Sequence, residues 1–101
     1  MNYTKLNYEG YEEYLVGEGE ILIFGGLAYE FKFDNNFGAS VIKHYGSYGN
    51  QEDLFELAVL YDGCITYTSG ITDDVIGWLK NDDVLFFLEE IKSLKNLEEE
   101  I

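Results

Sequence analysis

The alternation of apolar and polar positions is clearest near the middle of the chain, where two runs flank a tight turn. Residues 54–61 carry an apolar side chain at every second position, and residues 64–68 repeat the alternation after the dipeptide Asp62–Gly63. A period of two indicates a strand with one buried face, and Asp-Gly suits a two-residue hairpin turn. We therefore expect a β-hairpin here, followed by an acidic turn and a short helix or turn at 75–79.

Two earlier segments also have strand patterns. Residues 21–33 are rich in apolar and aromatic side chains, and Gly25–Gly26 divides them. This segment is either a hairpin with a Gly-Gly turn or a single strand bent by a bulge. Its second half alternates aromatic with charged residues, so one face is expected to be buried. Residues 39–45 form the next predicted strand.

The end of the chain has the periodicity of a helix. Residues 82–97 place apolar side chains three and four positions apart, and Asn81 is the expected N-cap. Phe86 lies off the centre of this apolar stripe. The stripe consists of Val84, Phe87, Leu88, Ile91 and Leu94.

The first twenty residues differ from the rest because acidic residues alternate with tyrosines. Tyr11, Tyr14 and Leu15 have the spacing of one helical turn, whereas glycines limit any longer helix. We expect a loop or short helix whose tyrosine rings pack on the sheet and whose carboxylates stay in water.

These elements predict one α+β domain over residues 1–101. It comprises the acidic, tyrosine-rich segment 1–20, an antiparallel sheet at 21–68 and a helical part at 72–97. The sheet is expected to be a meander of four to five strands with the helix across one face. One helix cannot cover both faces, so the N-terminal segment or a second subunit should cover the other, and we expect a homodimer. Alternation places on that second face Ala39, Val41, Tyr45, Ala58 and Leu60.

The charge of the chain indicates which kind of partner it can bind. Aspartate and glutamate together number 20, against 6 basic residues, and the net charge is −14. Every basic residue is a lysine. Nucleic-acid phosphates and anionic lipids repel such a chain, because it lacks the cations that would neutralise them. A basic protein is therefore the expected partner, although an acidic surface can also serve solubility alone.

Residues for nucleophilic catalysis are scarce in this sequence. His44 is the only histidine and Cys64 the only cysteine. A Ser-His-acid or Cys-His arrangement would have to use His44, which lies within a strand pattern. One cysteine allows neither an internal disulfide nor a cysteine-based zinc site within the chain. We therefore expect a protein that is not an enzyme and binds no cofactor.

The acidic residues also invite a search for metal ligands. Residues 34–38 resemble the start of a calcium loop, but the glycine comes one position early and Tyr45 replaces the closing acid. The acid pairs at 73–74 and 82–83 precede predicted helical segments, where capping already explains them. We therefore expect no metal site.

The first residues lack a basic start followed by an apolar run, which argues against a signal peptide. The longest apolar runs are only a few residues, too short to span a bilayer. We expect the protein to be cytoplasmic.

Three stretches carry a resemblance to known proteins: FGASVIKHYGSYG, FELAVLYDGCITYTSGITDDVIGWL and the acidic start of the last helix. Over residues 37–94 the chain resembles small accessory proteins encoded by tailed phages and prophages. The resemblance carries no catalytic motif. It implies a phage origin and an accessory role in the infected cell, such as an anti-CRISPR or anti-restriction inhibitor of host defence.

The sequence thus favours an acidic inhibitor that occludes a basic site on a nucleic-acid-binding defence protein of the host. The alternative is a homo-oligomeric structural or assembly protein of a phage. In the inhibitor, carboxylates would take the place of phosphates on the partner. The expected partner-binding residues are Glu9, Glu12, Glu13, Glu52, Asp53, Asp73 and Asp74.

Overall fold

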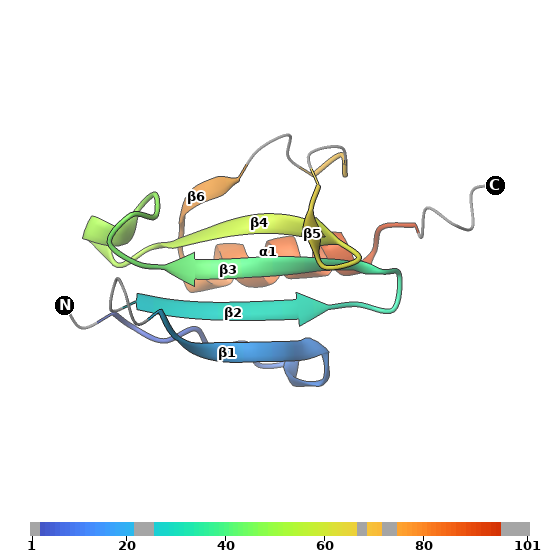
Figure 1. Cartoon of the computed structure of the whole chain (residues 1–101), viewed down its shortest axis with the longest axis horizontal. Helices are drawn as coiled ribbons and strands as arrows, with labels where there is room; N and C mark the ends of the chain where they lie inside the picture. The colour runs from blue at the N-terminus through green and yellow to red at the C-terminus, as the bar shows by residue number, and fades with distance from the viewer. Residues whose placement is uncertain (1–2, 22–25, 67–68, 72–74, 96–101) are drawn as a thin grey trace.

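The computed structural model describes residues 3–21, 26–66, 69–71 and 75–95. Within these ranges the main element is a six-stranded antiparallel sheet, in which β1 to β5 follow one another as a meander and β6 pairs with β4 (Figure 1). One α-helix, α1 (Asn81–Lys92), packs against the sheet, which confirms the predicted α+β fold. The strands are β1 (Leu15–Ile21), β2 (Gly26–Lys32), β3 (Phe37–Lys43), β4 (Phe55–Tyr61), β5 (Cys64–Ile65) and β6 (Ile76–Leu79).

The pairing of β2, β3 and β4 defines a core face of the sheet. Ala39 on β3 lies opposite Phe31 on β2 and Val59 on β4. Directly opposite residues project to the same face, so Ala39 belongs with the buried aromatic residues. Val41, two residues further on, shares that face and is fully buried. The prediction that Ala39 and Val41 lie on the second face is therefore wrong, because alternation within one strand does not say which of its faces meets the core.

The other predicted residues of the second face divide into two groups. Ala58 and Leu60 do lie there, opposite Ser40 and Gly38. Both are nonetheless buried. Tyr45 lies in the turn after β3 and is 76% exposed.

Helix α1 covers part of the core face. Val84, Leu88 and Ile91 are fully buried, which confirms the predicted stripe. Phe87 and Leu94 are partly buried against the same core. Because α1 contacts β3, β4 and β6, it lies over the end of the sheet that the last strands form.

The two ends of α1 differ from the prediction. Lys80 rather than Asn81 is the N-cap, and the Asp83 carboxylate accepts its backbone N–H at 3.0 Å. The helix ends at Lys92, earlier than predicted. Near that end the side-chain amide of Asn35 donates to three main-chain carbonyls, at 2.8–3.2 Å. Asn35 comes from the turn after β2, so a contact distant in sequence satisfies the last carbonyls.

The short helix or turn predicted at 75–79 is wrong, because Ile76–Leu79 forms β6. Gly77 lowers the helical propensity of so short a segment. The backbone of β6 instead pairs with one end of β4, opposite Phe55 and Leu57. Trp78 has φ of 61°, which an α-helix does not allow.

The N-terminal part holds one correct and one wrong prediction. Glu12–Tyr14 forms a single 3₁₀ turn, η1, as the tyrosine spacing indicated. Residues 15–20 were expected to be loop, but they belong to β1, which pairs antiparallel with β2. Their glycines and glutamates are typical of loops, yet a strand at the edge of a sheet tolerates them. The segment 15–32 is therefore a hairpin whose first strand comes earlier than predicted. The predicted Gly25–Gly26 turn is wrong, because Gly26 begins β2 and pairs with Ile21, and Gly25 lies outside the described residues.

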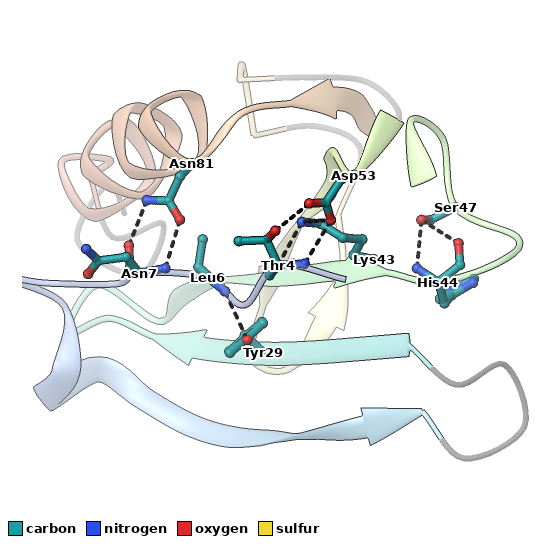
Figure 2. A network of polar contacts seen from close by, with 9 residues as sticks. All are labelled: Thr4, Leu6, Asn7, Tyr29, Lys43, His44, Ser47, Asp53 and Asn81. Carbon is teal, nitrogen blue, oxygen red and sulfur yellow. Dashed lines mark hydrogen bonds and ion pairs between the residues drawn. The ribbon is translucent and has the colours of Figure 1, made fainter. Parts of the chain in front are cut away.

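Residues 3–14, called the N-terminal segment from here on, run beside α1 on the core face (Figures 1 and 2). Leu6 is buried in the core. The ring of Tyr8 lies 6.0 Å, centroid to centroid, from the rings of Tyr29 and Phe31 on β2. The segment therefore covers β2 while α1 covers β3 and β4, and it does not lie on the second face.

Candidate interaction surface

A buried lysine fixes the start of the N-terminal segment. Lys43 ends β3 on the core face, and only 1% of its side chain is exposed. Its ammonium donates to the Thr4 carbonyl oxygen at 2.9 Å and pairs with Asp53 Oδ1 at 2.9 Å (Figure 2). It also lies 3.7 Å from the centre of the Phe55 ring, close enough for a cation–π contact. These partners replace the water that a buried charge loses.

Asp53 completes this contact from the other side. It follows the 3₁₀ turn η2 (Asn50–Glu52) in a left-handed conformation, with φ of 61°. Its carboxylate accepts the Thr4 backbone N–H at 2.9 Å and the Thr4 hydroxyl. Burial alone would raise the pKa of Asp53, but hydrogen bonds from Thr4 and Lys43 outweigh it and lower the pKa from 3.8 to about 2.

Further hydrogen bonds hold the middle of the segment. The Leu6 backbone N–H donates to the Tyr29 hydroxyl at 3.1 Å. The side chain of Asn81 accepts the Asn7 N–H and donates to the Asn7 carbonyl, both at 2.8 Å (Figure 2). Asn81, predicted as a helix cap, therefore joins α1 to the N-terminal segment.

The end of the segment reaches the last turns of α1. The Tyr11 hydroxyl donates to Glu89 Oε2 at 3.3 Å. Burial raises the pKa of Tyr11, and the charge and hydrogen bond of Glu89 raise it further. Lys92 lies 3.8 Å from the same carboxylate and 5.4 Å from the centre of the Tyr14 ring. The segment and the helix thus stay side by side from Asn7 to Tyr14.

This arrangement gathers exposed carboxylates from two separate parts of the chain. Phe86 on α1 is 58% exposed, and acids stand three and four residues before and after it. Such spacings share one side of a helix. The N-terminal segment adds three exposed glutamates beside the helix. We call this the acidic face, and it consists of Asp82, Asp83, Glu89 and Glu90 around Phe86 on α1, together with Glu9, Glu12 and Glu13 of the N-terminal segment beside the helix.

A shallow cavity of about 510 Å³ opens on the N-terminal segment next to this face. Lys5, Leu6, Asn7 and Tyr8 line it together with two glutamates of the acidic face. One cationic and two anionic side chains around a short apolar stretch suit contact with a protein surface better than enclosure of a small molecule.

The predicted partner-binding residues therefore divide into three groups. Glu9, Glu12 and Glu13 lie together on the acidic face, and Glu52 is exposed in η2. Asp53 also lies near the surface, but its carboxylate is already bound by Lys43 and Thr4. The pair at 73–74 lies outside the described residues.

The region around the only histidine shows a local turn. The Ser47 hydroxyl donates to the His44 carbonyl at 2.9 Å and accepts the His44 backbone N–H at 3.0 Å (Figure 2). Nδ1 of the imidazole accepts the Gly46 N–H. The serine hydroxyl thus bonds to main chain at both contacts. Over the described ranges, no three His, Cys, Asp or Glu side chains group as metal ligands.

Sequence reasoning missed Lys43 as the residue that anchors the segment. Lys43 has the same parity in its strand as Val41, which is fully buried. A charged residue at an apolar position of an alternating strand signals a buried ion pair, provided that the core face of the strand is known. That face became evident only from the pairing of β3 with its neighbours.

Comparison with protein families, with curated proteins and with solved structures found no match to this chain. The resemblance to phage accessory proteins therefore remains a prediction. Among the described residues, no helix has the length and apolar character needed to cross a membrane.

Proposed function

We propose that the protein is an acidic interaction protein that occludes a basic site of a nucleic-acid-binding host protein, in the manner of a phage-encoded inhibitor of host defence. The observation that supports this is the acidic face, where four carboxylates of α1 surround the exposed ring of Phe86 and the N-terminal segment beside the helix adds three more. Carboxylates steer a basic partner into contact, and a central aromatic ring supplies apolar burial. A helix that served only solubility would not need an exposed phenylalanine there.

Two matched double variants test this function. Glu13→Gln with Glu90→Gln removes two charges from the acidic face, at side chains that form no hydrogen bond or ion pair with the described part of the chain. Asp34→Asn with Asp62→Asn removes two charges from exposed turns elsewhere. Each variant is immobilised and exposed to lysate of a bacterial host, and the bound proteins are identified by mass spectrometry and titrated.

The acidic-face variant should bind the captured protein roughly five-fold or more weakly, and the turn variant should bind it as the wild type does. Nucleic acid should compete with the wild-type protein for the same partner. Equal losses in both variants, or no competition by nucleic acid, would contradict occlusion of a nucleic-acid site by this face.

The second sheet face favours one alternative, a homo-oligomeric assembly protein. Ile65 on this face is 51% exposed, and Ile42 is half-buried. Glu30 and Lys32 are exposed two residues apart on β2, so they project to the same face. A second copy related by a two-fold axis could place each Glu30 against the partner copy's Lys32.

Charge reversal tests this dimer by sedimentation. Glu30→Lys alone and Lys32→Glu alone should each be monomeric, because like charges would then meet across the two-fold axis. An equimolar mixture of the two variants should restore the dimer, since opposite charges face each other again. If the wild type is monomeric at every concentration, or the mixture stays monomeric, this alternative is wrong.

A further inference from the structure

The one tryptophan of the chain has an unusual backbone. Trp78 lies in β6 with φ of 61°, a left-handed conformation that a bulky residue rarely adopts. Its side chain is 56% exposed. The strained conformation therefore does not serve to bury the indole in the core.

Close backbone packing holds Trp78 in this position. The pairing of β6 with β4 shifts register between Phe55 and Leu57, and such a bulge re-aims a side chain. Gly49 lies so close that an added Cβ would stand 2.9 Å from the Trp78 Cα. An added Cβ at Gly77 would stand 2.4 Å from the Tyr48 Cβ. The two glycines thus allow β6 and the loop before η2 to touch.

This packing places Tyr48 next to Trp78. Its carbonyl accepts the Trp78 N–H at 3.4 Å, and its own N–H donates to Glu56 Oε2 at 2.7 Å. Its side chain is 62% exposed. The main chains of two exposed aromatic residues are therefore held next to each other, and the Glu56 carboxylate fixes Tyr48 from its other side.

We propose that Tyr48 and Trp78 form an aromatic platform that binds an arginine or lysine side chain of a basic partner protein. This inference rests on the proposed function, because it names a second contact for the same partner. Strained residues that the surrounding fold over-determines cluster at binding sites. Tryptophan and tyrosine are also the residue types most enriched among binding hot spots.

The charges around the platform select a cationic occupant. Glu56 binds the Tyr48 backbone, and Glu52 is exposed in η2 a few residues further along the same loop. The ammonium of Lys43, at the end of the strand before this loop, is neutralised by Asp53, and Lys80 is exposed two residues after Trp78. A cation over an aromatic face gains from the ring quadrupole and, beside carboxylates, from charge as well.

The platform is also continuous with the acidic face. Strand β6 leads through Lys80 directly into the first turn of α1, where Asp82 and Asp83 begin that face. Figure 1 shows β6 leading into α1, so a basic partner that binds along the helix would have the platform at the N-terminal end of its site.

Trp78 itself reports on binding, because its fluorescence can be excited without a second indole. The probe is an octa-arginine peptide at physiological salt, and its binding is measured in parallel by calorimetry. We expect a saturable change in the emission of Trp78. Tyr48→Ala should weaken binding of the peptide at least five-fold, whereas Tyr45→Ala, in the same loop, should leave it unchanged.

A glycine variant separates a binding role from a structural one. Glycine adopts the left-handed conformation without strain. Trp78→Gly should therefore keep or raise the midpoint of thermal unfolding while it weakens peptide binding as Tyr48→Ala does. A midpoint lowered by several degrees would assign Trp78 a structural role and overturn the platform.

The outcomes also separate the platform from the proposed function. If the peptide binds by calorimetry while Trp78 emission and the Tyr48→Ala affinity are unchanged, the platform is wrong and the acidic face remains the binding surface. If the peptide does not bind at all, the platform is likewise wrong. If the platform variants weaken binding and Glu13→Gln with Glu90→Gln does not, the platform stands and the acidic face fails.

Discussion

At the scale of single residues, the contact between Lys43 and Asp53 determines where the N-terminal segment lies. The lysine is buried and its partner carboxylate is 43% exposed, so the ammonium carries most of the desolvation. Lys43 is tolerated in the core because an aspartate, a main-chain carbonyl and an aromatic ring all face it. The path of the segment then determines where its three glutamates on the acidic face lie.

Removal of the Asp53 side chain should therefore lower the free energy of unfolding by more than its partial exposure suggests. Asp53→Ala leaves Lys43 buried with an acceptor missing, which should lower the free energy of unfolding by about 1–3 kcal/mol. Lys43→Met combined with Asp53→Ala removes both charges, so the double variant should be at least as stable as Asp53→Ala alone. Urea denaturation measures both. A double variant that is less stable than Asp53→Ala would show that the ion pair is not the source of the loss.

Low pH should remove the stabilisation that the ionised Asp53 carboxylate provides. The pKa of Asp53 is lowered in the folded protein to about 2 from 3.8, so its contribution is present above pH 3.8 and is lost as the pH falls towards 2. The difference in melting midpoint between the wild type and Asp53→Asn should therefore shrink from pH 5 to pH 2. A difference that stays constant over this range would contradict the lowered pKa.

At the scale of elements, the sequence pattern predicted the hairpin turn and the helix, because residues close together in the chain determine both. The Asp62–Gly63 turn has φ of 52° and 82°, as the hairpin prediction requires, and the α1 stripe is buried. Strands β1 and β6 could not be predicted in this way. Their glycines are typical of loops and turns. The two segments become strands because they pair with β2 and β4. The acidic face was predicted only in part. The sequence identified the glutamates of the N-terminal segment, but their position beside α1 depends on the contacts that Lys43 and Asn81 make.

The two sides of α1 should respond differently to truncation. Leu88→Ala or Ile91→Ala opens a cavity in the core and should lower the free energy of unfolding by about 2–5 kcal/mol. Phe86→Ala should change it by less than about 0.5 kcal/mol although it removes a large ring, because that ring is exposed. Denaturant titration distinguishes these values. A loss at Phe86 comparable with that at Leu88 would contradict its exposure and its assignment to the acidic face.

At the scale of the whole molecule, the net charge is −14, and two surfaces differ in the charge that they carry. The side formed by the N-terminal segment and α1 carries seven acids, and the second face of the sheet carries Glu30 and Lys32. The first surface repels a copy of itself and attracts a basic protein, whereas the second can pair with a copy of itself.

Metal ions should have little effect on the folded chain. The described residues place no three suitable ligands together. Melting midpoints in chelator, calcium, magnesium and zinc are therefore expected to agree within error. A rise of several degrees with calcium would identify the turn at 34–38 as a ligand loop.

The most direct measurement is the rate at which this protein associates with the proposed basic partner, once that partner is captured from bacterial lysate, at several salt concentrations. The Debye length falls from about 30 Å at 0.01 M salt to about 8 Å at 0.15 M. If the acidic face steers the partner, the association rate constant should fall steeply over this range, and Glu13→Gln with Glu90→Gln should flatten the dependence. A rate constant that does not change with salt, or that depends on salt equally in wild type and variant, would contradict binding through the acidic face.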